Sequence, residues 1–147
     1  MIIRDFLPDD RTEFLQMCSD FYSGDAVAHA VNPIHFTRTF DQLMEKNHFI
    51  RGLAVEHDGA IAGYCQLSFT WSNEAGGLTV WIEELYVREK YRSRGLGSEF
   101  FEFVQREIPV ARYRLEVEPE NERAIALYRR KGFEVLPYGQ MVKDIEQ

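Results

Sequence analysis

The sequence has few of the features that mark membrane or secreted proteins. No stretch approaches the roughly 18 consecutive apolar residues of a membrane-spanning helix, and the first residues, MIIRDFLPDD, lack the apolar centre of a signal peptide. Only two cysteines are present, Cys18 and Cys65, and they lie far apart in apolar-patterned segments. We expect them to be buried thiols in a reducing compartment, without a disulfide. These absences predict a cytoplasmic protein with no membrane partner.

Basic residues are in the minority. The chain has 17 Lys and Arg against 24 Asp and Glu, and its formal net charge of −7 argues against a nucleic-acid partner. The four histidines show no metal-ligand spacing, so we expect no metal site; His29 and His35 are candidates for lining a ligand pocket. The basic charge that is present gathers locally and suggests a small anionic ligand. Four basic residues stand within seven positions, namely Arg88, Lys90, Arg92 and Arg94.

The organisation of the chain is that of a single domain over residues 1–147. A length of 147 residues with 45% hydrophobic content allows a sizeable core, and no repeat, linker or low-complexity segment interrupts it. Apolar periodicity and turn residues predict an α/β (α+β) domain with helices against a mixed sheet. The predicted strands are 1–6, 48–57, 60–70, 78–88, 112–118, 133–136 and 138–145, and the predicted helices begin near 8, 32, 95 and 121.

Two glycines and two arginines stand at the joint between a predicted strand and a predicted helix. The first N–H groups of a helix lack internal partners, and glycine lets a ligand approach the backbone, so Gly95 and Gly97 favour an anion site. Arg92 and Arg94 add charge-assisted hydrogen bonds. The motif is no P-loop, because it lacks the lysine, and Phe100 replaces the third glycine of a dinucleotide fingerprint. A tight surface turn would explain the same residues.

Two segments resemble motifs of the GNAT superfamily of N-acetyltransferases. Arg92-Ser-Arg-Gly-Leu-Gly97 is similar to its motif A, [Gln/Arg]-x-x-Gly-x-[Gly/Ala]. Residues 121–135, NERAIALYRRKGFEV, are similar to its motif B, with the intervening strand in the expected place. Together the matches cover residues 78–135. The matching positions of motif B are Asn121, Ala124, Leu127, Tyr128, Gly132 and Phe133.

The resemblance implies a fold and a co-substrate. The fold is a GNAT-like domain whose mixed sheet of six or seven strands is splayed between strands four and five, with helices on both faces. The co-substrate is acetyl-CoA. The residues implied to bind its pyrophosphate are Arg92, Arg94, Gly95, Leu96, Gly97 and Ser98, and those whose backbone pairs with its pantetheine arm are Leu85, Tyr86 and Val87. Asn121 contacts the cofactor arm or, alternatively, only caps its helix.

Two adjacent carboxylates interrupt an apolar strand. Glu83 falls in phase with Trp81, and Glu84 with Ile82, so a regular strand would point them to opposite faces. A carboxylate on an apolar strand face needs a reason, because burying its charge without a partner is costly. The reason is either an ordinary one, such as a solvated strand end or an ion pair, or a general base with a raised pKa.

The resemblance also implies catalytic roles. The stretch WIEELYV is similar to the Glu-Asp-x-x-Val strand of polyamine acetyltransferases, which makes Glu83 the base, acting directly or through water. Glu84 is then the second carboxylate, which holds the substrate ammonium group; it replaces the usual Asp with a longer side chain. Tyr128 matches the family's general acid toward the coenzyme A sulfur. A half-buried tyrosine on an amphipathic helix is the alternative interpretation.

The predicted activity is acetyl transfer from acetyl-CoA to a primary amine by direct attack in a ternary complex. Net charge and the paired glutamates favour a small cationic acceptor such as a polyamine. A protein N-terminal amine or lysine is the alternative acceptor, and a non-catalytic acyl-CoA-sensing module is the alternative outside enzymes. Members of the family are often dimers, and the aromatic content would suit a homodimer interface.

Overall fold

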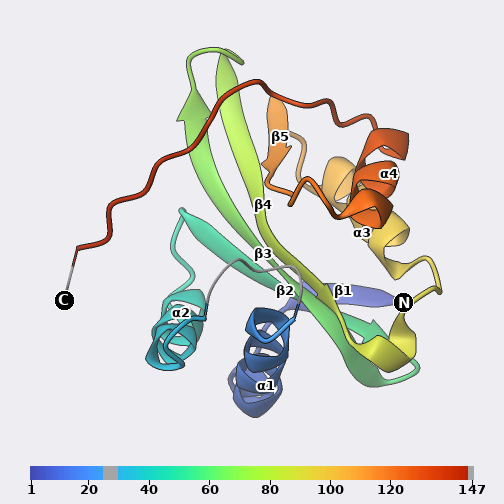
Figure 1. Cartoon of the computed structure of the whole chain (residues 1–147). Coiled ribbons are helices and arrows are strands. Elements are labelled where there is room, and N and C mark those ends of the chain that lie inside the picture. The colour runs from blue at the N-terminus through green and yellow to red at the C-terminus, as the bar shows by residue number, and fades with distance from the viewer. Residues whose placement is uncertain (25–29, 146–147) are drawn as a thin grey trace.

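The computed structural model describes residues 1–24 and 30–145. Within these residues the chain forms an α/β domain with four α-helices and one five-stranded mixed sheet (Figure 1). None of the helices in this part of the chain has the length and apolar character required to cross a membrane. In chain order the elements are β1 (Ile2–Asp5), the 3-10 helix η1 (Pro8–Asp10), α1 (Arg11–Tyr22), α2 (Ile34–Met44), β2 (Ile50–His57), β3 (Ala60–Ser72), β4 (Gly77–Val87), the 3-10 helix η2 (Glu89–Tyr91), α3 (Leu96–Glu107), β5 (Arg112–Leu115) and α4 (Glu122–Arg130).

The sheet has the strand order β1-β2-β3-β4-β5. The first four strands are antiparallel, and β5 joins β4 in parallel after the α3 crossover. Asp58 and Gly59 have φ angles of 52° and 79°, the left-handed pair that a two-residue type I′ hairpin needs, which confirms the predicted β2–β3 turn. The β4–β5 ladder is short, because Thr79–Ile82 pair with Arg112–Leu115 and no pair follows within the described residues.

Helices cover both faces of the sheet, as expected (Figure 1). Ala54 of β2 and Tyr64 of β3 belong to the core formed with α1 and α2. Their neighbours Leu53 and Cys65 point the other way, into the core formed with α3. This alternation follows from the two-residue period of a strand. Cys18, in the first core, and Cys65 are both buried free thiols, which confirms that part of the sequence prediction.

The expected six or seven strands are not formed, because the predicted strands 133–136 and 138–145 are absent. This C-terminal segment leaves α4 as an extended chain, crosses the end of the sheet and runs outward (Figure 1). Strands exist only where another strand satisfies their backbone groups. Among the described residues no strand pairs with this segment, so its alternating sequence pattern by itself was not sufficient. β5 likewise ends at Leu115 instead of 118.

Candidate active site

Strand β4 contains a bulge at the two predicted carboxylates. Gln66 of β3 lies opposite Glu84, but the next residue, Leu67, lies opposite Ile82. Glu83 is therefore an extra residue on β4 without its own partner in the ladder. A bulge of this kind breaks the strict alternation of side chains and redirects the residues at the insertion.

The bulge brings both carboxylates to one face of the sheet. Glu83 Oε1 accepts a hydrogen bond from Ser68 Oγ at 2.6 Å, and Glu84 Oε1 accepts one from Tyr64 Oη at 2.5 Å. Ser68 and Tyr64 are four residues apart on the regular strand β3, so they point to the same face. The expectation that the two glutamates alternate between faces is therefore wrong, and the bulge is the physical reason.

Glu84 lies in a half-buried polar cluster built from α1, β3 and β4. Its second oxygen, Oε2, accepts a hydrogen bond from the hydroxyl of Tyr22, whose ring stacks on Phe36 of α2 at 5.4 Å between centroids. Burial raises the pKa of Glu84, the hydrogen bonds from Tyr22 and Tyr64 lower it, and the neighbouring charge of Glu83 raises it further. The pKa of Glu84 is therefore higher than that of an ordinary glutamate.

The groups around Glu84 remain protonated donors. Burial, followed by the interaction with Glu84, raises the pKa of both Tyr22 and Tyr64. Burial raises the pKa of the Cys18 thiol on the same side to about 12. Glu83, in contrast, is exposed and accessible from solvent. The site therefore pairs a sequestered carboxylate with an accessible one.

The loop before α3 has the geometry of an anion site. Gly95, at φ 77°, is the N-cap residue and offers no side chain for capping. The first helical bond runs from Glu99 N–H to the Gly95 carbonyl at 3.0 Å. The N–H groups of Leu96, Gly97 and Ser98 have no acceptor among the described residues. Unpaired N–H groups together with the positive end of the helix dipole favour a bound anion.

The two arginines of the loop make different contacts. Arg92 donates from Nε to the Val87 carbonyl at 2.9 Å, which ties the loop to the end of β4. Arg94 lies over the ring of Tyr91, with 5.9 Å from Cζ to the ring centroid. A cavity of about 480 Å³ opens beside this loop, and its lining residues are Asp20, Tyr86, Arg88, Glu89, Lys90 and Arg92.

Helix α4 connects the two sequence motifs. Arg123 donates to Ser93 Oγ at 2.9 Å, and a Cβ added to Gly97 would lie 3.4 Å from Leu127. Asn121 caps the helix, with Oδ1 accepting from Ala124 N–H at 3.2 Å, so its capping role is confirmed. Tyr128 packs in the core on the α3 side, 5.6 Å from the Phe101 ring centroid. Burial raises the pKa of Tyr128.

Comparison with known families decides the identity of the domain. A profile described as "Acetyltransferase (GNAT) family" matches residues 11–133, which include the bulged strand, the loop and α4. The chain belongs to the GNAT family. It is an acetyl-CoA-dependent acetyltransferase, with acetyl-CoA as co-substrate.

Solved structures of similar fold are numerous, although no curated protein matches the chain significantly. A possible acetyltransferase from Clostridium difficile 630 is 18% identical, with a TM-score of 0.83 over 99% of this chain and 98% of that one. AAC(6')-Iy in complex with a bisubstrate analog, CoA-S-monomethyl-acetylneamine, is 16% identical, with a TM-score of 0.77 over 98% and 97%. Ribosomal-protein-alanine N-acetyltransferase from Brucella melitensis biovar Abortus 2308 is 15% identical, with a TM-score of 0.72 over 98% and 99%.

Sequence reasoning missed three polar partners in this GNAT domain. Tyr64 and Ser68 hold the glutamates, and Arg123 holds the loop. Their positions give a weak signal: Tyr64 and Ser68 have the even spacing of one strand face, but only the register shows which residues they face. His29 lies outside the described residues, and His35 is exposed on α2. The described residues hold no group of three or more metal-ligating side chains.

Proposed function

We propose that this GNAT enzyme acetylates a primary amine of a small cationic molecule of the polyamine type, by direct attack in a ternary complex. The observation that carries the proposal is the pair Glu83 and Glu84, which share one face of β4 directly beyond the last β4–β5 pair. Two adjacent carboxylates attract a cation, and the net charge of −7 adds a weak field of the same sign. A single domain covering residues 1–147 is part of the proposal.

The co-substrate would lie across the end of β4 and the start of α3. Supporting this placement, Leu85–Val87 continue β4 past its last pair with β5, so an extended pantetheine arm can add there like a strand. The unpaired N–H groups at the start of α3 suit its pyrophosphate. The residues proposed for that group are Arg92, Arg94, Gly95, Leu96, Gly97 and Ser98. Asn121 would use its Nδ2 toward the cofactor arm, since Oδ1 caps α4.

Each proposed catalytic residue meets one chemical demand. An ammonium group has no lone pair, so Glu83, which is exposed, accepts its proton directly or through water. The buried charge of Glu84 holds the cationic acceptor beside it. As the amine nitrogen bonds to the acetyl carbon and the carbon–sulfur bond breaks, Tyr128 donates its hydroxyl proton to the sulfur. Its raised pKa means that this proton is present at neutral pH.

Other acceptors and a non-catalytic role are the competing hypotheses. Solved structures of this fold include one with an aminoglycoside-type bisubstrate analog and one named as a ribosomal-protein-alanine N-acetyltransferase. At this low identity these structures support only the fold and do not select the acceptor. Aminoglycosides and protein amines are therefore tested as alternative acceptors. An acyl-CoA sensor would need the loop alone and would not need Glu83 or Tyr128.

The test is release of free coenzyme A from acetyl-CoA with separate panels of polyamines, aminoglycosides, amino acids and peptides. We expect turnover with polyamines or similar small cations and a loss of about 100-fold or more in Glu83→Gln, the range for removing a general base. A matched control is Glu45→Gln, which removes an exposed carboxylate at the end of α2 and should leave turnover unchanged. Turnover only with peptides would overturn the small-cation proposal, and tight acetyl-CoA binding without turnover would favour the sensor.

A further inference from the structure

Ser93 holds a backbone conformation that serine rarely adopts. Its φ angle is 62°, in the left-handed region, and it stands between Arg92 and Arg94 in the loop before α3. Residues other than glycine are strained in this region, because the Cβ comes too close to the following carbonyl oxygen. Such strain persists only where the surrounding structure maintains it, and it concentrates at functional sites. The loop that suits an anion therefore contains a residue whose conformation needs support from elsewhere in the chain.

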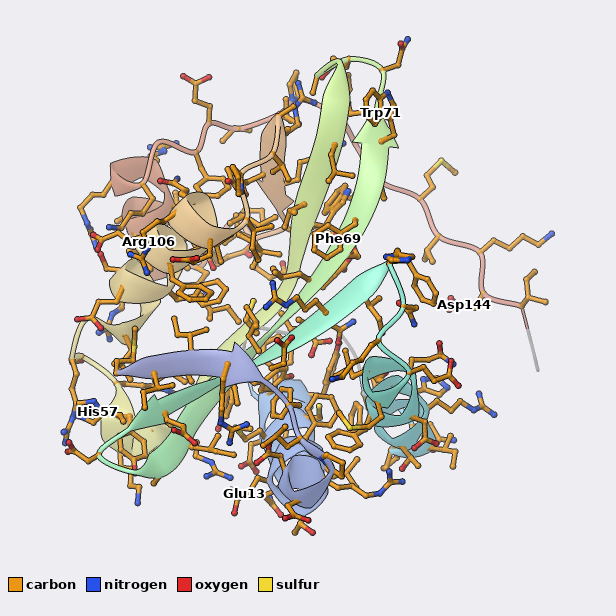
Figure 2. The ribbon with its side chains drawn as sticks, turned by 180° about the vertical axis from the view of Figure 1, so that it is seen from behind. Glu13, His57, Phe69, Trp71, Arg106 and Asp144 are labelled. Carbon is orange, nitrogen blue, oxygen red and sulfur yellow. The ribbon has the colours of Figure 1, made fainter. Side chains whose placement is uncertain are left out.

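Arg123 of α4 supplies this support. Its guanidinium donates from Nη2 to Ser93 Oγ at 2.9 Å, between residues 30 positions apart in the chain. Helix α4 lies beside α3 in both views of the molecule (Figures 1 and 2). A second contact lies one turn further along α4, where Leu127 would be 3.4 Å from a Cβ added to Gly97. Arg123 thus connects the loop to the helix that contains Tyr128.

The position of Arg123 is unfavourable for its own helix. It is the second residue of α4, after Glu122, and the first turn of a helix carries the positive end of the helix dipole. An acidic side chain stabilises a helix at this end, whereas a basic one does not. Arg123 is also exposed, so it adds little to the hydrophobic core. The stability of α4 therefore does not account for an arginine at this position.

We propose that Arg123 is a positioning residue for the co-substrate. By holding Ser93 in its left-handed conformation, it fixes the loop whose N–H groups receive the pyrophosphate of acetyl-CoA. Those N–H groups, of Leu96, Gly97 and Ser98, have no acceptor among the described residues. A loop that is fixed before binding loses less conformational entropy when the ligand arrives. This role rests on the proposed placement of the pyrophosphate at the loop, and in it Arg123 acts through Ser93 without touching phosphate.

Calorimetric titration with two acetyl donors tests the role. One donor is acetyl-CoA, and the other is acetyl-pantetheine, which has the same thioester but no pyrophosphate. We expect Arg123→Leu to raise the Kd for acetyl-CoA about tenfold, the effect of releasing one strained residue, and to change the Kd for acetyl-pantetheine by less than about twofold. The matched control, Arg130→Leu, removes an exposed arginine from the last turn of α4 and should leave both values unchanged. An unchanged Kd for acetyl-CoA, or equal losses for the two donors, would overturn the proposal.

A second variant separates positioning from direct contact with phosphate. Glycine adopts the left-handed conformation without strain and has no Oγ, so in a Ser93→Gly protein the hydrogen bond from Arg123 is neither possible nor needed. In that background Arg123→Leu should change the Kd for acetyl-CoA by less than about twofold. A loss of about tenfold in both backgrounds would overturn the proposal, because Arg123 would then bind the phosphate itself.

Thermal unfolding separates positioning from a structural role. Arg123→Leu removes an unfavourable charge from the first turn of α4, so the variant should unfold at the wild-type temperature or slightly above it. A lower melting temperature together with the weaker binding would overturn the proposal. These measurements need no acceptor amine, so they do not depend on whether the enzyme accepts a polyamine. If wild type binds acetyl-CoA no more tightly than acetyl-pantetheine, the proposed placement of the pyrophosphate is wrong, and this role of Arg123 is wrong with it.

Discussion

The carboxylate of Glu84 lies between two tyrosine hydroxyls in a half-buried site, and this single residue has a predictable effect on stability. Its folded-state pKa is raised above the ordinary value of 4.5, mainly by burial. Below the ordinary value the group is protonated in both states and adds nothing. Above the raised value the folded protein contains a buried charge, so stability is lost as pH rises through this window. The loss is about 1.4 kcal/mol for each tenfold difference in proton affinity between the folded and unfolded carboxylate.

Glu84→Gln should remove this dependence. The free energy of unfolding of the variant relative to wild type should increase as pH rises above 4.5, because the variant has no charge to bury. Urea unfolding at a series of pH values measures it. Comparing the two proteins cancels the opposite slope from Asp5 and Asp10, whose pKa values are lowered mainly by hydrogen bonds from Arg51 and Arg4. Parallel curves for the two proteins would contradict the buried-charge interpretation.

Tyr128 is the second residue with a sharp prediction. Tyr128→Phe keeps the ring packed on Phe101 and removes only the proton proposed for the leaving sulfur. We expect kcat to fall about 100-fold, with the Kd for acetyl-CoA changed by less than about twofold. Steady-state kinetics and calorimetric titration measure the two quantities.

A matched control for Tyr128→Phe is Tyr113→Phe. The Tyr113 hydroxyl donates to the Ile108 carbonyl at 2.8 Å, a structural bond. Its removal should cost about 1 kcal/mol of stability and leave kcat unchanged. If the Tyr128→Phe variant turns over as fast as wild type, Tyr128 has no part in the proton transfer. That result would not change the interpretation of the fold or of the anion-binding loop.

Among the elements, β3 and β4 approach each other closely at Gly63. A Cβ added there would lie 2.2 Å from the Tyr86 carbonyl oxygen, a backbone atom that cannot move without displacing β4. Gly63→Ala should therefore push away the end of β4 where we place the pantetheine arm. We expect a loss of about 2–3 kcal/mol in stability and weaker acetyl-CoA binding.

Thermal unfolding and calorimetric titration of acetyl-CoA check the Gly63→Ala prediction. The control is Gly24→Ala, where the nearest atoms would lie 3.5 Å from the new Cβ and no left-handed backbone is needed. That variant should unfold within a few degrees of wild type. Equal melting temperatures and equal acetyl-CoA affinity for Gly63→Ala and wild type would show that β4 tolerates the displacement.

At the scale of the whole molecule, helices cover both faces of one sheet, and β5 is an edge strand of that sheet (Figure 1). The proposed acetyltransferase site lies where β4 extends beyond β5, because the short β5 leaves the end of β4 without a parallel partner among the described residues.

The sequence alone determined the local structure of this protein. Turn and capping residues such as Asp58-Gly59 and Asn121 act within a few positions, so the hairpin and the start of α4 were predictable. Apolar periodicity likewise predicted the four helices, and the two motifs predicted the loop with its unpaired N–H groups.

The tertiary structure decided the features that depend on register and on partners. A pattern with period two cannot reveal a one-residue insertion, so only the pairing of β3 with β4 placed Glu83 and Glu84 on one face. Residues 133–145 have the alternation of strands, but hydrogen bonds to a neighbour make a strand, and the described chain supplies none. Distant residues choose these partners, and short-range sequence patterns do not contain that choice.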